Sequence, residues 1–315
     1  MGDPIYTEFR HPRQMLASQE YDGHLSIHDD KIAEDLGFAG APIEGPTHFS
    51  QFVHILEAQF GEPFFERGCI SAHYQNMVVE GEQVRAFVEP LADGASITRI
   101  GAEKPDGTPV LTGTASLGPD YGDTEISQRM ARLTPSDQLV ILSELTVGQK
   151  GAGNPEDAVM AFDQNMGALY PFSLNQKLAA ITETHPYYTE EGAKNSPWGR
   201  PIIPMEMISV LVQYTSDQSG FRAKGPAVGL FAGQEIKMIK GPLFVGQPYL
   251  LEREIIALSE SRRTESNWIK TSVFDADTKE LCAEVILNSA TMKNSYASYD
   301  EEAKKIAKAL GKTLD

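Results

Sequence analysis

The sequence predicts an α+β protein made of two tandem copies of one unit, in which a long helix is followed by an antiparallel sheet. The chain has 315 residues, about twice the ~150 residues of a common domain. A helical pattern followed by strand-like runs occurs in the first half, and the same order occurs again in the second half. Such an internal repeat, with a period of about half the chain, indicates two related units.

The first predicted helix covers residues 47–60, where apolar residues recur at steps of three and four. The stripe consists of Phe49, Phe52, Val53, Leu56 and Phe60. Gly61 and Pro63 end this helix. Because the stripe is strongly apolar, we expect the helix to be buried at the centre of its unit.

Runs of strand character follow this helix, and turn residues such as Gly81 and the Asp93-Gly94 pair separate them. The first-half runs cover 69–79, 83–89, 96–102 and 110–117. The second half repeats the order, with a helical stripe at Met205, Ile208, Leu211 and Val212 and runs at 229–239, 249–258, 267–274 and 281–289. Closely spaced strands with short turns predict an antiparallel meander in each half.

These patterns divide the chain into four parts. Residues 1–120 form the N-terminal unit and residues 165–295 the C-terminal unit. Residues 121–164 are acidic and rich in turn residues, and we interpret them as a linker. The tail, residues 296–315, is predicted to form a short surface helix.

Composition excludes several classes of function. Lys and Arg number 27 and Asp and Glu 44, and the net charge of −17 repels polyanions, so no nucleic-acid partner is expected. Cys69 and Cys282 are the cysteines of the sequence and have no metal-type spacing, which favours a reducing cytoplasm. No apolar run reaches the roughly 18 residues that cross a bilayer, so no membrane partner is expected.

One motif in the first half carries a resemblance to a known family. His28 is followed five residues later by Ala33, then by a Gly-Phe pair at 37–38, and Gly45 opens the predicted helix. This pattern resembles the hydratase signature of MaoC-like proteins. The resemblance implies a double hot dog fold, in which each long central helix is wrapped by an antiparallel sheet.

The second half departs from this signature at its two main positions. Tyr188 occupies the place of the His, and Pro204 occupies the place of the helix-opening Gly. These replacements remove an imidazole and a backbone N–H donor. In similar double hot dog hydratases one half keeps the active site, so we expect catalysis in the first half and a degenerate second half.

The resemblance implies that a carboxylate and His28 activate a water, while the Gly45 N–H at the helix start stabilises the oxyanion. The family acid lies five residues before the His, but position 23 is Gly and Asp22 lies one residue further away. Either an irregularity of one residue brings Asp22 beside His28, or the chemistry is altered. Glu183 and His185 form an alternative acid–base pair in the second half.

The substrate implied by the resemblance is an acyl-CoA thioester, and coenzyme A is part of that substrate rather than a separate cofactor. Its phosphates would need a local basic cluster within the acidic protein, and Arg85, Lys237 and Lys240 are the candidates for substrate binding. His24 and His48 are further candidates, although His48 is also compatible with a packed core residue. A group of acidic and His residues at 22–29 has no further ligands in the sequence, so we predict no metal.

The leading function is hydration of a 2-enoyl thioester, or the reverse dehydration, with a 3-hydroxyacyl product of R configuration by family analogy. A hot dog thioesterase is an alternative, suggested by the Asp22-Gly23-His24 stretch. A non-catalytic subunit that binds acyl thioesters is a second alternative. Because each half can supply a partner sheet to the other, a homodimer is compatible with the sequence but not required.

Overall fold

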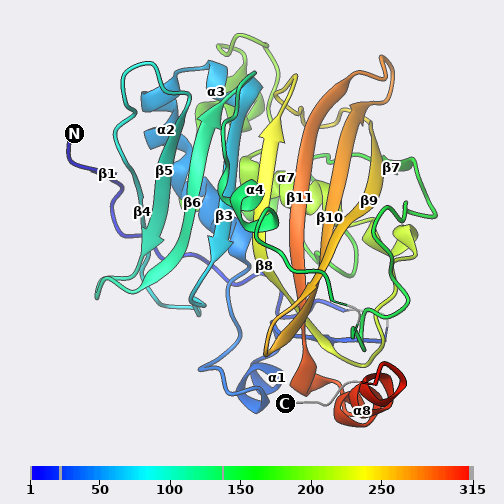
Figure 1. The fold of residues 1–315 in the computed structure, drawn as a ribbon. Helices are drawn as coiled ribbons and strands as arrows, with labels where there is room; N and C mark the ends of the chain where they lie inside the picture. The colour runs from blue at the N-terminus through cyan, green and yellow to red at the C-terminus, as the bar shows by residue number, and fades with distance from the viewer. Residues whose placement is uncertain (1, 21–22, 137, 312–315) are drawn as a thin grey trace.

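The computed structural model describes residues 2–20, 23–136 and 138–311. Within this part of the chain there is one curved sheet of 11 strands, and helices α2 and α7 lie behind it in Figure 1. The strand order is β1-β4-β5-β6-β3-β8-β11-β10-β9-β7, and β2 pairs with β8 outside this path. The strands are β1 (Ile5–Tyr6), β2 (Leu25–Ser26), β3 (Gly68–Tyr74), β4 (Arg85–Val88), β5 (Ile97–Glu103), β6 (Pro109–Leu117), β7 (Glu156–Ala158), β8 (Val228–Met238), β9 (Tyr249–Glu260), β10 (Thr264–Asp275) and β11 (Leu281–Met292).

The helical elements are mostly short. The α-helices are α1 (Asp30–Asp35), α2 (Val53–Phe60), α3 (Pro63–Arg67), α4 (Glu125–Met130), α5 (Leu174–Leu178), α6 (Glu190–Ala193), α7 (Met205–Gln213) and α8 (Tyr299–Ala309). The 3-10 helices are η1 (Gly45–Phe52), η2 (Pro186–Tyr188), η3 (Ser216–Ser219) and η4 (Lys293–Ser295). None of these helices, within the residues described, is long and apolar enough to cross a bilayer.

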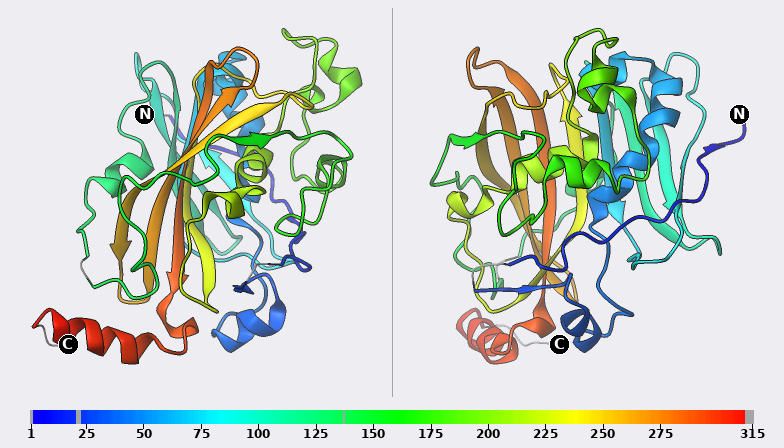
Figure 2. Two further views of the ribbon diagram at one scale, coloured as in Figure 1. Left: turned by 90° about the vertical axis from the view of Figure 1, so that its right-hand side faces the viewer. Right: turned by 180° about the vertical axis from the view of Figure 1, so that it is seen from behind.

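The two halves of the chain share this sheet. Strand β3 of the first half pairs antiparallel with β8 of the second half, which places Ala72 opposite Gln234. Seen from behind in Figure 2, η1 with α2 and α7 lie against the same face of the sheet. Phe52 and Leu56 from the first helix and Leu211 from α7 belong to one buried apolar core. The predicted fold, with two units that each combine a central helix and an antiparallel sheet, is confirmed.

The first central helix differs from its predicted form at its start. It begins at Gly45 rather than at Thr47, and its first 8 residues form the tighter 3-10 helix η1 before α2 continues to Phe60. Pro46 occupies a first-turn position, where its missing N–H is not needed. The helix therefore opens next to residues 42–45, which line the cavity described below.

The segment expected to be a linker, residues 121–164, is packed into the fold where the structure describes it, at 121–136 and 138–164. It contains α4 and β7, and β7 pairs antiparallel with β9. Ile141 and Leu142 are buried against the second-half part of the sheet, and the N–H groups of residues 140–142 donate to the carboxylate of Glu265 at 2.8–3.0 Å. Its apolar residues explain the difference, because their burial is more favourable than exposure in a free linker.

The N-terminal segment connects the two halves. Strand β1 pairs with β4 of the first half, whereas β2 pairs in parallel with β8 of the second half. This pairing holds the residues that follow β2 beside the second-half part of the sheet. His28 lies two residues after β2 and is thereby placed at the boundary between the two halves. The tail helix α8 lies at the same end of the molecule as α1 in Figure 1, where Glu302 pairs with Lys224 at 2.6 Å.

Candidate active site

A cavity of about 380 Å³ lies at the boundary between the two halves. Its first-half wall includes His28 and Gly45, and its second-half wall includes residues of β8, β10 and β11. His24 and His48 also line it. The structure therefore brings together four of the residues selected from the sequence, although their chemical roles remain predictions.

His28 lies between β2 and α1 and is held by the backbone of Pro42. The His28 Nδ1 atom is 2.7 Å from the carbonyl oxygen of Pro42. Because a carbonyl oxygen only accepts hydrogen bonds, Nδ1 carries the proton and Nε2 of the neutral ring keeps its lone pair. Burial of the ring lowers the pKa of His28 to about 4. The imidazole is therefore neutral at pH 7 and can accept a proton at Nε2.

Gly45 supplies a backbone donor at the start of η1. Pro46 has no N–H, and the N–H of Thr47 donates to the carbonyl of Glu44 at 3.1 Å, so the Gly45 N–H is the amide left for a ligand. The ring of Tyr74 packs directly on this glycine, because a Cβ at position 45 would lie 2.6 Å from two ring atoms. The position requires glycine for this close approach.

The hydroxyl of Tyr74 is a second donor in the same region. This oxygen is buried and has no hydrogen-bond partner among the described residues. Burial, with a smaller effect of Glu44, raises the pKa of Tyr74 well above its ordinary value, so the hydroxyl stays protonated. A buried donor without a partner at the cavity wall is suited to an oxygen atom of a ligand.

Glu44 is a candidate residue that the sequence reasoning missed. Among the described residues that line the cavity it is the one carboxylic acid, and it directly precedes Gly45. Tyr170 from the second half donates its hydroxyl to Glu44 Oε1 at 3.1 Å. Burial raises the pKa of Glu44 to about 7, although the nearby Lys177 ammonium opposes this shift. An acidic residue next to the helix-opening glycine was the signal available in the sequence.

The remaining histidines of the cavity are held differently. His24 has its Nδ1 3.3 Å from the carbonyl of Ala227, and its ring lies against the backbone of Gly225. His48 is buried, its Nδ1 has no partner among the described residues, and burial lowers its pKa to about 4. Asp22, the predicted acid, lies outside the described residues.

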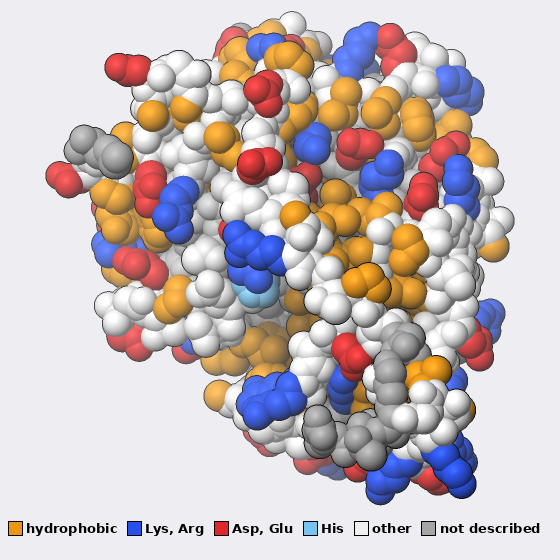
Figure 3. Space-filling view, viewed as in Figure 1, with side chains coloured by type: hydrophobic (Ala, Val, Ile, Leu, Met, Phe, Trp, Pro, Cys, Tyr) orange, Lys and Arg blue, Asp and Glu red, His pale blue; other side chains and the backbone are white. Residues whose placement is uncertain are grey.

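The three basic residues proposed for substrate binding do not line the cavity. Each pairs with a carboxylate: Arg85 with Glu103 at 2.6 Å, Lys237 with Glu235 at 3.3 Å, and Lys240 with Glu280 at 2.5 Å. The strand order separates them, because β4 lies toward the first-half edge while the cavity is lined by residues 229–232 of β8. On the described part of the face in Figure 3, Lys and Arg are interspersed with Asp and Glu and form no single patch.

The corresponding place in the second half is nearly filled. Its cavity measures about 20 Å³, and Tyr188 lines it together with apolar residues of both halves, including Phe49 and Ile70. Tyr188 is buried, and burial raises its pKa, so its phenol stays neutral. Pro204 precedes α7 at the N-cap position. This half therefore offers little space for a substrate at that position.

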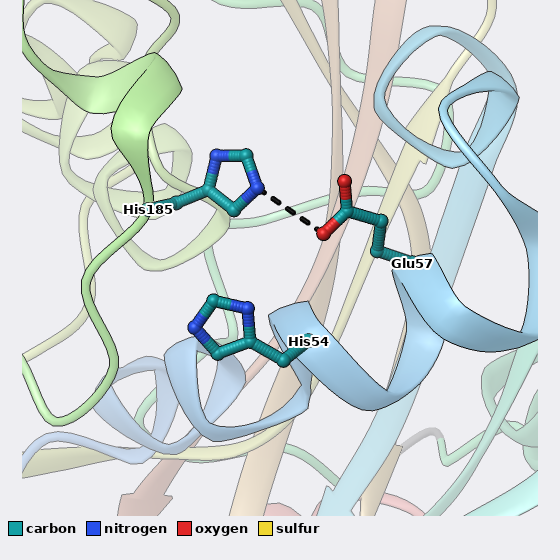
Figure 4. Close-up of side chains that lie close together, drawn as sticks. All are labelled: His54, Glu57 and His185. Atoms are coloured by element: carbon teal, nitrogen blue, oxygen red, sulfur yellow. Dashed lines mark hydrogen bonds and ion pairs between the residues drawn. The ribbon is translucent and has the colours of Figure 1, made fainter. Parts of the chain in front are cut away.

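The alternative acid–base pair of the second half is separated. Glu183 lies 2.8 Å from Arg10, whereas His185 Nε2 lies 3.2 Å from Glu57 Oε2. His54 completes the group drawn in Figure 4, and its ring centroid is 5.7 Å from that of His185. Neither Glu183 nor His185 lines the large cavity among the residues described.

The His54, Glu57 and His185 side chains are close enough to be considered as metal ligands. However, the Tyr187 N–H donates to His185 Nδ1 at 3.2 Å, which leaves the ring proton on Nε2, the atom that points at Glu57. A metal ion would need the lone pair of this same nitrogen. The hydrogen bonds of His185 therefore favour a His–Glu contact over metal ligation.

The duplicated helix-and-sheet unit, with the cavity of about 380 Å³ at the boundary between the halves, defines a double hot dog protein. No protein-family model and no curated protein matches the chain. Among solved structures, it resembles a MaoC-domain dehydratase, described as putative, from Chloroflexus aurantiacus, with 13% identity, a TM-score of 0.56, and coverage of 93% of this chain and 95% of that chain. It also resembles a conserved hypothetical protein from Mycobacterium tuberculosis described as having a double hot dog fold, with 10% identity, a TM-score of 0.56, and coverage of 93% and 97%. At these identities the likeness concerns the fold.

Proposed function

We propose that this protein adds water to a 2-enoyl thioester, or removes water from the 3-hydroxyacyl thioester, in the cavity between its halves. The observation that carries the proposal is the neutral His28, whose Nδ1 is bonded to Pro42 and whose Nε2 is left as a base in the same cavity as Gly45. A structural neighbour described as a MaoC-domain dehydratase is consistent with this chemistry.

In the hydration direction, His28 Nε2 accepts a proton from water as the water oxygen bonds to C3. The electrons of the C2–C3 double bond move toward the thioester oxygen, where the Gly45 N–H and the Tyr74 hydroxyl are the donors that stabilise the enolate. A general acid then delivers a proton to C2 as the enolate collapses to the thioester. General acid–base groups of this kind typically contribute about 10²–10⁴-fold each.

We assign the proton at C2 to Glu44. A pKa of about 7 lets this carboxyl exist in both protonation states near neutral pH, which suits proton transfer in either direction. After hydration, the proton on His28 returns to the Glu44 carboxylate through solvent, so both groups regain their starting states. Asp22, one residue away from the place of the family acid, remains a candidate from the sequence, and Glu44 is the acid that the described cavity contains.

The proposed substrate is a coenzyme A thioester, with a product of R configuration, and both features follow from the family resemblance. Within the described residues no Lys or Arg lines the cavity. The cavity is therefore assigned to the acyl chain and the thioester, and the phosphates of coenzyme A are assigned to the protein surface.

Thioester hydrolysis is a second candidate, and Glu44 is the observation that favours it. A carboxylate next to an oxyanion donor can activate water for attack on the thioester carbonyl instead of on C3. The free thiol and the loss of the conjugated double bond report separately on these two reactions.

The test incubates the full chain with 2-enoyl-CoA thioesters of several chain lengths and follows alkene absorbance and free thiol in parallel. We expect loss of the alkene signal without release of thiol, and His28→Ala should lower kcat by about 10²–10⁴-fold. His11→Ala is the matched control, because His11 is exposed and does not line the cavity.

Three outcomes contradict the proposal. Release of thiol with an intact alkene indicates a thioesterase, and binding without either signal indicates a non-catalytic subunit. If His28→Ala keeps full activity while Glu183→Gln abolishes it, the second half is the catalytic one.

A further inference from the structure

The second-half wall of the cavity has a polar section inside a mainly apolar sheet. On β10 the cavity is lined by Asn267 and Ile269, and on β11 by Leu287, Ser289 and Thr291. These are alternate residues of each strand, so their side chains point into the cavity and those of the residues between them point to the other face. The sheet therefore presents selected side chains to the acyl chain.

The register of β10 and β11 arranges these side chains in pairs. Ile269 lies opposite Leu287, and two residues along, Asn267 lies opposite Ser289. Directly opposite residues on one face of an antiparallel pair are neighbours. An apolar pair is thus followed by a polar pair, which we name the Asn267–Ser289 pair.

These polar side chains are not used by the protein itself. Within the described residues, no hydrogen bond forms from the side chain of Asn267, Ser289 or Thr291. Gln213, the last residue of α7, also lines the cavity, and its Nε2 is buried without a partner in the described part of the chain. Buried polar groups normally have partners, and leaving one unpaired is costly, so the buried Gln213 amide indicates a polar atom in a ligand. Asn267 and Ser289 are half-buried, and their free side chains offer further donors and acceptors at the same cavity.

The charge of the wall limits what that ligand carries. Among the described lining residues there is no Lys or Arg, so a chain that ends in a carboxylate would bury its charge unpaired. Glu44, the one acidic lining residue, belongs to the reacting end described above. An uncharged oxygen, which can accept from an amide N–H and exchange hydrogen bonds with a hydroxyl, matches the groups present.

We propose that the substrates are acyl thioesters whose chain carries a hydroxyl or ketone oxygen beyond the reacting carbons, and that the Asn267–Ser289 pair and Gln213 bind this oxygen. This inference rests on the proposed function for the orientation of the chain, with the thioester at Gly45. An unsubstituted alkyl chain would leave the polar groups unpaired, so we expect it to bind at least about 10-fold more weakly than the oxygenated chain.

The binding experiment uses S-alkyl-CoA thioethers, which cannot react, with chains of equal length that are either unsubstituted or carry a hydroxyl scanned along the distal carbons. Calorimetry gives Kd for each compound with the full chain. We expect one hydroxyl position to improve affinity by about 10- to 100-fold over the unsubstituted chain. Asn267→Leu should remove this preference by weakening the hydroxylated compound and strengthening the unsubstituted one.

Ser289→Ala should reduce the same preference, and Ser272→Ala is its matched control. Ser272 lies on the neighbouring strand β10 and does not line the cavity, so the same loss of a hydroxyl there should leave the preference intact. Circular dichroism checks that each variant keeps the fold.

Equal affinity for both kinds of chain, or a preference that Asn267→Leu leaves unchanged, would overturn the inference even if the enzyme hydrates enoyl-CoA. Conversely, a hydroxyl preference that Asn267→Leu removes, without any hydration, would support the inference and reject the proposed reaction. The binding and turnover measurements therefore fail independently.

Discussion

Replacing Glu44 with Gln keeps the size of this side chain and removes its ability to transfer a proton. Hydration as proposed needs neutral His28 and protonated Glu44, and burial sets the pKa values of these groups to about 4 and about 7. As the pH is raised, kcat/KM should therefore increase through about pH 4, where His28 loses its proton, and decrease through about pH 7, where Glu44 loses its proton. With a pKa of about 7, Glu44 is about nine-tenths protonated at pH 6 and one-tenth at pH 8, so kcat/KM should fall about tenfold between them.

The assay measures kcat/KM for an enoyl-CoA between pH 4 and pH 9 for the wild type and for Glu44→Gln. The variant should lose about 10²–10⁴-fold at pH 6 and should have no alkaline limb. Glu34→Gln is the control, because Glu34 is an exposed residue of α1. If Glu44→Gln retains the same alkaline limb with the same midpoint, another group causes it and the assignment of Glu44 is refuted.

Stability gives a second measurement of the same group. The pKa of Glu44 is raised in the folded protein from its ordinary value of 4.5, so the folded state binds this proton more tightly than the unfolded state. The stabilisation linked to this proton is fully present below about pH 4.5 and is lost as the pH rises through about 7. Urea unfolding of the wild type should show this loss between pH 5 and pH 8, and Glu44→Gln should show less of it.

Three further changes test other parts of the structure. In Gly45→Ala, the new Cβ would lie 2.6 Å from the Tyr74 ring and should push this ring away from the Gly45 N–H. We therefore expect kcat to fall about 10²–10³-fold. A fully active variant would contradict the assignment of these groups as oxyanion donors. Arg253 contacts Glu156 at 2.8 Å, and Arg253→Met leaves this carboxylate as an unpaired buried charge. The free energy of unfolding in urea should therefore fall by about 3–5 kcal/mol. A decrease below about 1 kcal/mol would reject this reasoning. Tyr188→Phe should change kcat less than threefold (~0.7 kcal/mol), because its hydroxyl lies in the filled second-half position; a large loss would assign a catalytic role to that half.

Local patterns in the sequence were sufficient for the central helices, the main strands and the repeat. The stripe from Phe49 to Phe60 reflects the 3.6-residue period of a helix, and turn residues such as Gly81 and the Asp93-Gly94 pair separate the strand-like runs. The motif that contains His28 and Gly45 was also readable, because both residues lie within one short stretch whose spacing is visible in the sequence. Both residues line the cavity.

The functional surroundings of these two residues were decided by the tertiary structure. Glu44 acquires its raised pKa from burial, a property that depends on segments far away in the chain, such as the one that carries Tyr170. Arg85 and Lys237 could not be placed from the sequence, because only the strand order shows which residues reach the cavity.

The sequence by itself determined the two helix-and-sheet units and the first-half position of the candidate base, since both depend on the periodicity and spacing of nearby residues. The tertiary structure alone decided that the cavity is shared by both halves, that Tyr188 lines a nearly filled space, and that Asn267 and Ser289 line the larger cavity. The physical reason is that a cavity wall is made by pairing and packing between distant segments, and no local period in the chain records those contacts.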